Sequence, residues 1–155
     1  MAAERPIQHC IRLLLVVVIS RIVFAKIYNP CDLAKEMVTK QRFPKEDIAN
    51  WICLIKHESD FDTSVIGRLN SDGSLDHGLF QISDLFWCNH DGIDGACGVN
   101  CDDLRNDDIK DDSICARRIY RITKHRTGNG FNAWAGWTQH CRQNNVQQYV
   151  ANCTL

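Results

Sequence analysis

The chain of 155 residues lacks the features that mark several large classes of protein. It has no low-complexity tract and no internal repeat, and its content of 45% apolar and 24% charged residues excludes a disordered chain. Its longest apolar run, residues 13–19, is far shorter than the roughly 20 residues that cross a membrane, so we expect no stable membrane insertion. These absences leave an ordinary globular protein with one compact domain.

A surplus of positive charge is also missing, since the chain carries 18 basic and 19 acidic residues. Residues 1–25 hold three of the arginines and one glutamate, so the formal net charge changes from −1 for the whole chain to −3 for residues 26–155. A mildly acidic protein has no favourable field toward phosphate chains. We therefore expect no nucleic-acid partner, and killing of cells by membrane disruption fits poorly as well.

Two common catalytic patterns are absent. His57-Glu58 is not followed by a second histidine at a zinc-binding spacing, and the other histidines are scattered. The chain also contains no G-x-S-x-G segment, the turn that carries the serine nucleophile in many hydrolases. The sequence therefore predicts neither zinc catalysis nor a serine hydrolase.

The N-terminus has a secretory pattern. The apolar run at 13–19 follows Arg5 and Arg12, and Val23-Phe24-Ala25 offers small or apolar residues at the expected cleavage positions. We therefore predict a signal peptide at 1–25 and a secreted, extracellular protein.

Cysteine is the residue that the chain has in abundance, with nine copies. Removal of the signal peptide takes Cys10 away and leaves eight, an even number that can form four disulfides in an oxidising compartment. The mature domain then spans residues 26–155.

Hydrophobic periodicity predicts helices at both ends of the mature chain. Asn29-Pro30 is a helix start, and Pro44 leads an acidic first turn before a second helix. Shorter helical pieces are expected at 134–140 and 146–149. A third helix is expected at 113–122, with four residues on its buried side: Ile114, Ala116, Ile119 and Ile122.

The middle of the chain has a different character. Residues 65–83 flank the hairpin-turn signal Asn70-Ser71-Asp72-Gly73, which predicts a small antiparallel sheet. Residues 86–101 are rich in turns and cysteines, so disulfides should hold this loop. The fold class is therefore α+β, mostly helical, with a small sheet lobe and a cleft between the lobes.

Glu58 is the first candidate for chemistry, because it continues the apolar stripe of Trp51, Leu54 and Ile55 on the second helix. Burial and a helix C-terminus both penalise a carboxylate, so we expect a raised pKa for Glu58. Such a group can act as a general acid near neutral pH. The alternative is that Glu58 lies at a fraying helix end and simply reaches solvent.

Asp76 is the second candidate. It lies among the polar residues His77 and Gln81, so its carboxylate should be hydrated or hydrogen-bonded and stay ionised. A protonated acid that faces an ionised carboxylate is what cleavage of a glycosidic bond requires. The sequence leaves three competing carboxylates: Asp60, Asp62 and Asp72.

Aromatic residues offer flat apolar surfaces on which sugar rings can stack, although most tryptophans simply belong to the core of a protein. Four of them lie in the segments that follow the candidate carboxylates: Phe86, Trp87, Trp134 and Trp137.

Several segments resemble the family of C-type lysozymes and α-lactalbumins, and the resemblance covers nearly all of 26–155. The family's signature is matched by Cys97-x3-Cys101-x2-Leu104-x3-Asp108-Ile109-x5-Cys115. Glu58-Ser59-x-Phe61 is similar to the segment of the catalytic acid, and Asn132-Ala133-Trp134 to the segment that walls it. The strand of the second carboxylate is matched by Ser71-Asp72-Gly73-Ser74-x-Asp76-x-Gly78-x-x-Gln81-Ile82.

The resemblance implies an antibacterial or digestive muramidase. Such an enzyme cuts the β-1,4 bond between N-acetylmuramic acid and N-acetylglucosamine in bacterial peptidoglycan, with retention of configuration. Glu58 would serve as the acid and then the base, and Asp76 as the nucleophile or the stabiliser of positive charge. Lysozyme is itself the standard example of this carboxylate pair, so the resemblance and the electrostatic argument are not independent.

The resemblance also implies the substrate and its contacts. Chitin oligomers, whose linkage and N-acetyl groups are similar, are a second candidate substrate. No cofactor is required, and a monomer is expected. The substrate-binding residues would be Gln81, Ser83, Phe86, Trp87 and Trp134.

The family's disulfides map onto one of the many pairings that eight cysteines allow. The implied pairs are Cys31 with Cys153, Cys53 with Cys141, Cys88 with Cys101, and Cys97 with Cys115.

Three departures from the family pattern keep a second hypothesis open. Phe86 replaces a tryptophan, so an indole N–H bond to sugar is lost, and Ser83 stands where an asparagine is expected. A longer stretch between Ile119 and Trp134 carries basic residues around 121–126. The alternative is a weakly active or non-catalytic sugar-binding protein of the same fold, such as a gamete-surface protein.

Residues 102–112 are rich in aspartate and resemble the calcium elbow of α-lactalbumin and calcium-binding lysozymes. A neutral Asn106 in this elbow removes one charge and should weaken binding, and the alternative is a solvated acidic loop. The implied calcium ligands are carbonyls of Asp103 and Asp108 and side-chain oxygens of Asn106, Asp111 and Asp112.

Overall fold

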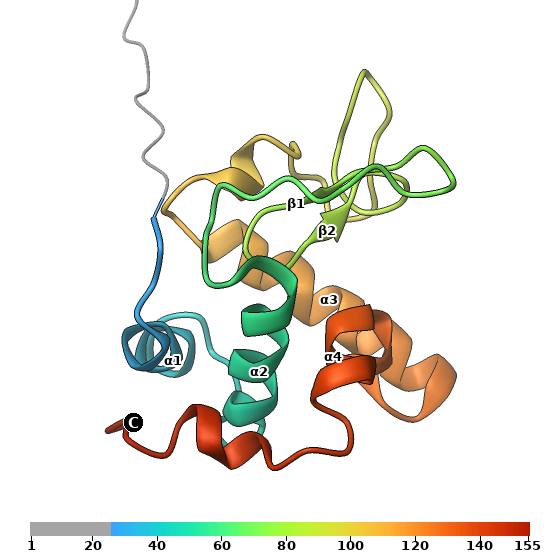
Figure 1. Ribbon diagram of the computed structural model, residues 1–155. Helices are drawn as coiled ribbons and strands as arrows, with labels where there is room; N and C mark the ends of the chain where they lie inside the picture. The colour runs from blue at the N-terminus through green and yellow to red at the C-terminus, as the bar shows by residue number, and fades with distance from the viewer. Residues whose placement is uncertain (1–25) are drawn as a thin grey trace, which may run out of the picture.

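The computed structural model describes residues 26–155, so the predicted signal peptide at 1–25 lies outside the described residues. Helices dominate this part of the chain (Figure 1), and none of them combines the length and the apolar character that a membrane crossing requires. The α-helices are α1 (Pro30–Thr39), α2 (Ile48–Ser59), α3 (Lys110–Thr127) and α4 (Ala135–His140). Single 3-10 turns are η1 (Lys45–Asp47), η2 (Asp103–Arg105), η3 (Gly130–Ala133) and η4 (Val146–Tyr149).

Local sequence explains where the helices begin and end. The side-chain oxygen of Asn29 accepts hydrogen bonds from the first N–H groups of α1, and Pro30 occupies the first helical position. Two aspartates lie in the first turn of α3, and Gly128 ends it with a φ of 82°. The predicted α+β class with helices at both ends is confirmed.

The third helix differs from its prediction. It spans 110–127 instead of 113–122, and two isoleucines expected on its buried side are exposed, Ile114 by 50% and Ile122 by 36%. The other two expected residues, Ala116 and Ile119, are buried, and the disulfide from Cys115 to Cys97 ties this face of the helix to the preceding loop. That face consists of Asp112, Ser113, Cys115, Ala116 and Ile119.

The antiparallel sheet is confirmed but is smaller than the segment 65–83. It consists of β1 (Asp76–His77) and β2 (Ile82–Ser83), in which Asp76 pairs with Ser83. The predicted turn at 70–73 forms, since the N–H of Gly73 donates to the carbonyl of Asn70 at 3.0 Å. It joins β1 to a preceding segment that pairs through an isolated bridge between Ile66 and His77, and it does not join the two strands.

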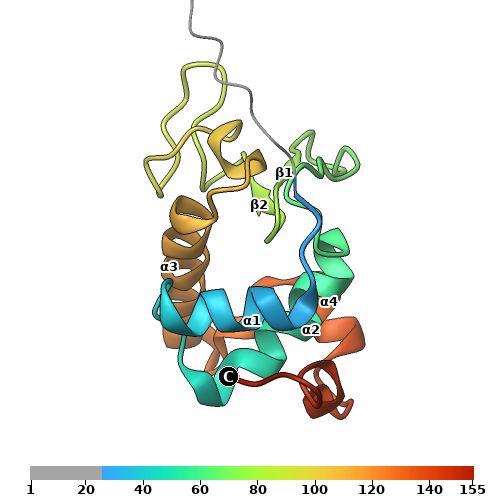
Figure 2. The same cartoon turned by 90° about the vertical axis from the view of Figure 1, so that its left-hand side faces the viewer.

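Helix α2 is the central element, with α1 and α4 packed against it and the sheet above its C-terminal end (Figures 1 and 2). Trp51 of α2 is 2% exposed and lies at the centre of the aromatic core. Its ring lies within 6 Å, centroid to centroid, of five others: Phe43, Phe80, Tyr120, Phe131 and Trp134. The helix that ends near Glu58 is therefore held on several sides.

Four disulfides link the described chain, and they are the pairs that the family resemblance implies. Two of them close long segments among the helices, and two hold the loop after β2 to itself and to α3. They are Cys31–Cys153, Cys53–Cys141, Cys88–Cys101 and Cys97–Cys115.

Candidate active site

A cleft of about 180 Å³ lies between the helices and the sheet, and Glu58 and Asp76 both line it. Residues from α2, β1, β2, α3 and the segment before α4 form its walls. The other lining residues are Gln81, Ile82, Ser83, Trp87, Ile119, Ala133, Trp134 and Ala135.

Glu58 is the last residue but one of α2 and is half-buried. Burial raises the pKa of Glu58, and the negative charge of Asp76 raises it further. The backbone N–H of Gly136 donates to Oε1 at 2.8 Å and opposes this shift, but the net pKa is raised. Glu58 therefore keeps its proton to a higher pH than an ordinary glutamic acid, as a general acid must.

Gly136 has no room for a side chain. A Cβ atom at this position would lie 2.7 Å from Oε1 of Glu58 and 3.2 Å from Cβ of His57. The glycine thus lets the start of α4 approach the carboxyl group closely enough for the N–H bond.

Trp134 forms one wall of the cleft. It is 5% exposed, and its indole N–H donates to the carbonyl of Phe80 at 2.9 Å. Because its ring also packs edge-on against Trp51, its orientation is fixed from two sides.

Asp76 projects from the other wall. It is half-buried on β1, and its Oδ2 accepts a hydrogen bond from Nδ2 of Asn70 at 3.1 Å. The same amide nitrogen of Asn70 also donates to Oγ of Ser74 at 3.0 Å. The turn at 70–73 therefore supplies the group that orients this carboxylate.

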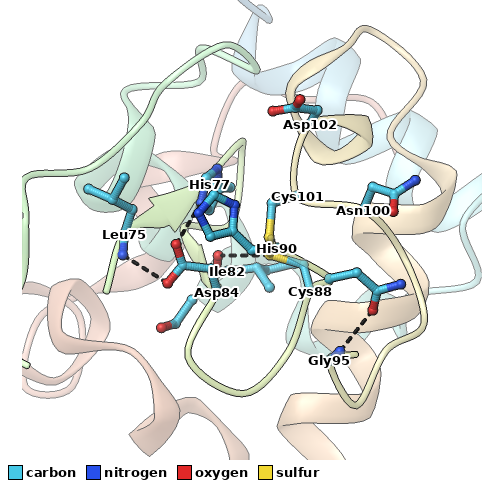
Figure 3. Close-up of a disulfide and its surroundings, with 12 residues drawn as sticks. Leu75, His77, Ile82, Asp84, Cys88, His90, Gly95, Asn100, Cys101 and Asp102 are labelled. Carbon is cyan, nitrogen blue, oxygen red and sulfur yellow. Dashed lines mark hydrogen bonds and ion pairs between the residues drawn. A yellow bond between two sulfur atoms is a disulfide. The ribbon is translucent and has the colours of Figure 1, made fainter. Parts of the chain in front are cut away.

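The strand that carries Asp76 is supported from its opposite face, because neighbouring side chains on a strand point to opposite sides. There Nε2 of His77 lies 3.4 Å from Oδ2 of Asp84, and Oδ1 of Asp84 accepts from the N–H of Leu75 at 3.0 Å (Figure 3). Figure 3 shows the Cys88–Cys101 disulfide beside this buried pair.

The structure brings only some of the expected substrate contacts together. Gln81, Ser83, Trp87 and Trp134 line the cleft, whereas Phe86 is 64% exposed and does not line it. The amide of Gln81 donates to the carbonyl of Gly78 at 2.9 Å, so part of its hydrogen-bonding capacity serves the turn. Ser83 Oγ accepts weakly from the N–H of Leu85 at 3.3 Å.

Trp137 has a structural position. Its indole N–H donates to Oδ1 of Asn50 at 2.9 Å, and its ring stacks on Phe131 with centroids 5.3 Å apart. Trp137 is 5% exposed and does not line the cleft, so it belongs to the core and not to the sugar-binding surface.

The three competing aspartates also lie away from the cleft. Asp60 forms an ion pair with Lys56, Asp62 accepts from the N–H of Ser64, and Asp72 accepts from Ser74. Of the four aspartates weighed, Asp76 alone lines the cleft.

Two residues that hold the candidate carboxyl groups are not predicted from the sequence. The sequence pattern at 70–73 predicts only a turn at Asn70, although the side chain of Asn70 orients Asp76. Gly136 has no side chain that could indicate a functional role, although its backbone N–H donates a hydrogen bond to Glu58. The only sequence signal for either residue is that Asn70 is polar and stands first in the turn.

The acidic segment forms a separate hollow of about 390 Å³ on the protein surface. Asp112 is 1% exposed, and its two carboxylate oxygens have no hydrogen-bond partner among the described residues. Burial raises the pKa of Asp112 well above its ordinary range, and the charge of Asp111 adds to this. The residues that line the hollow are Asp103, Asn106, Asp108, Lys110, Asp111 and Ile114.

The fit of this segment to calcium is partial. The unpartnered carboxylate of Asp112 is a suitable oxygen ligand for a hard cation. The side chain of Asn106, however, donates to the carbonyl of Asp103 at 2.7 Å and accepts from the N–H of Asp108. Within residues 26–155, the acidic groups of this segment do not gather three ligand atoms within 4.8 Å.

The two-lobed, disulfide-linked fold and the carboxyl pair in its cleft define a class of glycoside hydrolases. The model of the C-type lysozyme/alpha-lactalbumin family matches residues 26–153, and the chain belongs to this family. The lysozyme C of Equus asinus is 35% identical over 134 residues, which cover 84% of this chain and all of that protein.

Solved structures agree with this assignment. A lysozyme from Litopenaeus vannamei superposes with a TM-score of 0.76 at 33% identity, covering 84% of this chain and 98% of that one. A calcium-binding lysozyme from equine milk gives a TM-score of 0.71 at 34% identity, covering 84% of this chain and all of that one. The expected fold and family are confirmed, and the family supports a lysozyme-like glycoside hydrolase.

Proposed function

We propose that the protein is a secreted muramidase that hydrolyses the β-1,4 linkage between N-acetylmuramic acid and N-acetylglucosamine in bacterial peptidoglycan. One observation carries the proposal: a carboxyl group whose pKa is raised by burial shares a cleft with a carboxylate held by a polar turn. Glycoside hydrolysis needs this asymmetry between two carboxyl groups.

The reaction divides between the two walls. Glu58 donates its proton to the glycosidic oxygen, so the leaving sugar departs as a neutral alcohol. Asp76 attacks or stabilises the positively charged sugar carbon from the other wall. Glu58, now ionised, takes a proton from water, and the hydroxyl takes the place of Asp76 at the same carbon, so the carboxylate of Asp76 is released and the configuration is retained.

The cleft contains groups suited to an N-acetylated sugar. Trp87 and Trp134 offer aromatic surface, while Gln81 and Ser83 offer polar groups. Because these contacts do not read the lactyl group of muramic acid, chitin oligomers are a second substrate in this proposal.

Clearance of bacterial cell walls, followed by mass spectrometry of the released sugars, tests the proposal. The natural chain should clear walls between about pH 4 and 8, and Glu58→Gln should lower the rate by about 10³-fold, because a general acid contributes about 10²–10⁴-fold. Glu46→Gln, which alters an exposed glutamate of η1, is the matched control and should keep full activity. Equal rates for Glu58→Gln and the natural chain would overturn the assignment.

A binding protein with little turnover is the second candidate. The exposed position of Phe86 and the short side chain of Ser83 leave fewer sugar contacts than the family pattern offers. Calorimetric binding of N-acetylglucosamine oligomers without release of cleaved product would favour this candidate over the muramidase.

Secretion and a monomeric state belong to the same proposal. Four disulfides fit an extracellular compartment. N-terminal sequencing of protein secreted by cells should find Lys26 first, and light scattering should give the mass of one mature chain. An uncleaved N-terminus would contradict the signal peptide, and a dimer would contradict the monomeric state. Neither result would affect the proposed muramidase activity.

Weak calcium binding at the acidic hollow is a further part of the proposal. Asp111, which lines the hollow, and the buried Asp112 next to it in sequence would supply carboxylate oxygens, and a bound cation would offset the burial of Asp112. Calorimetry on chelator-treated protein should show one site, lost in Asp111→Asn plus Asp112→Asn but kept in the exposed control Asp102→Asn. Absence of any heat of binding would refute this part.

A further inference from the structure

A second hollow lies behind α3, away from the cleft. It has a volume of about 300 Å³ and is bordered by the segment between α1 and α2, by α2 itself and by one side of α3. Arg117 and Arg121 border it, whereas Ile119, between them in sequence, faces the cleft. Its full lining is Arg42, Phe43, Pro44, Asp47, Trp51, Ile114, Arg117, Tyr120 and Arg121.

Three arginines line this hollow. Among the ion pairs of residues 26–155, none involves Arg42, Arg117 or Arg121. Asp47 is the single acidic residue in the lining. Burial lowers the pKa of Arg117, and the charges of Arg121 and Arg42 lower it further, which places the three guanidinium groups within electrostatic reach of one another.

Side-chain contacts hold Arg117 in place, whereas Arg42 has an unfavourable backbone conformation. Arg117 donates to the carbonyl of Gln41 and lies over the ring of Phe43, 5.3 Å from its centroid. Arg42 has a φ of 61°, in the left-handed region that favours glycine. A bulky residue with this backbone conformation costs stability.

The remaining lining is apolar and aromatic. Phe43 and Trp51 form a buried floor, and Tyr120, Pro44 and the exposed Ile114 lie around it. Guanidinium groups match the geometry of a tetrahedral oxyanion, whereas aromatic and aliphatic surface suits the face of a sugar ring. The volume corresponds to the smaller end of ligand pockets.

We propose that Arg42, Arg117 and Arg121 form a binding site for a sugar that carries a phosphate or sulfate group. The anion lies among the three guanidinium groups, and the sugar ring lies against the aromatic lining. The site gives residues 26–155, whose formal net charge is −3, a local positive surface for anionic glycans. It explains Arg121 within the basic stretch at 121–126, and it does not depend on the proposed muramidase activity.

Calorimetry with four probes tests the site: glucose 6-phosphate, glucose 6-sulfate, inorganic phosphate and glucose. Glucose 6-phosphate should bind at one site, about tenfold more tightly than inorganic phosphate, and glucose should not bind. The sulfate ester separates the two anion classes: similar affinity assigns the site to tetrahedral oxyanions in general, and much weaker binding assigns it to phosphate. If glucose binds as tightly as glucose 6-phosphate, the anion does not contribute and the proposal is overturned.

Matched variants locate the binding. Arg121→Gln should weaken it by about tenfold or more, because hydrogen bonds to charged groups are strong, whereas Arg118→Gln removes the same charge from the exposed side of α3 and should change it less than about twofold. Asp47→Asn should tighten it. Equal affinities for Arg118→Gln and Arg121→Gln would show diffuse electrostatic attraction and overturn the site.

Arg42→Gly separates binding from folding. Glycine relieves the left-handed backbone at position 42, so the melting temperature should stay equal or rise while the affinity for glucose 6-phosphate falls by about tenfold. Unchanged affinity would remove Arg42 from the site. Binding to phosphatidylglycerol vesicles that glucose 6-phosphate does not compete away would assign the arginines to a lipid surface and overturn the sugar proposal.

Discussion

The two walls of the cleft hold their carboxyl groups in different ways. Glu58 closes a twelve-residue helix with a buried interior and accepts its hydrogen bond from a backbone N–H. Asp76 lies on a two-residue strand and accepts its hydrogen bond from the side chain of Asn70 in an exposed turn. The group proposed to keep its proton is placed by packing, and the group proposed to stay ionised is placed by polar side chains close to water.

The largest effect is expected from cutting the covalent ties of each wall. Cys53–Cys141 joins residues 88 apart on the helical wall, whereas Cys88–Cys101 joins residues 13 apart behind the sheet. The loss of loop-closure entropy predicts that replacing the first pair by alanines lowers the free energy of unfolding by about 4.5 kcal/mol, and the second by about 3 kcal/mol. Urea denaturation measures both, and a larger loss for the second pair would reverse the comparison.

Removing the charge from the sheet wall should have the next largest effect. Asp76→Asn keeps the shape of the side chain but removes the charge that stabilises the positive sugar carbon. We expect kcat to fall by about 10²-fold with little change in KM, the size seen when one stabilising group is removed. Steady-state kinetics on a soluble sugar oligomer measures this, with Asp72→Asn in the exposed turn as the control. Equal losses in both variants would deny Asp76 a special role.

Weakening the support behind the sheet should cost somewhat less. Asp84→Ala leaves His77 and the N–H of Leu75 without their acceptor in a buried site, which should lower the free energy of unfolding by about 2 kcal/mol. Asp91→Ala removes an exposed partner of His90 in the same lobe and should cost less than about 0.5 kcal/mol. Similar denaturation midpoints for the two variants would show that the buried pair contributes no special support.

The smallest predicted effect links the walls through space. Because the charge of Asp76 raises the pKa of Glu58, Asp76→Asn should lower that pKa, and carbon-13 resonance of the Glu58 carboxyl measures the change. A pKa raised by folding stabilises the fold below the ordinary glutamate pKa, and this contribution is lost as pH rises through the folded value. An unchanged titration would mean that the walls act separately.

The sequence predicted the wall made by periodic packing better than the wall made by polar contacts. Trp51, Leu54 and Ile55 placed Glu58 on the buried side of α2, because one helix face carries that information locally. The orientation of Asp76 depends on Asn70, and the support of β1 depends on Asp84, which are contacts between side chains that no period encodes.

Two expectations are wrong, each for its own physical reason. Ile114 and Ile122 fit the helical period of α3, yet the helix is turned so that Asp112 and Cys115 face inward. Periodicity alone does not include the disulfide of Cys115, which ties this face of the helix to the loop at Cys97. Phe86 likewise lies outside the cleft although it neighbours Trp87, because adjacent residues in a loop point in different directions.

The crowding at Gly136 restricts which amino acids this position tolerates during evolution. Any side chain there would meet the carboxyl group of Glu58, so even alanine would force that carboxyl group or the start of α4 to shift. Exposed residues outside the cleft, such as Phe86, can be exchanged one at a time without disturbing the acid. Position 136 offers no such gradual route, and descendants that replace this glycine would have to rebuild the neighbourhood of the acid in the same step.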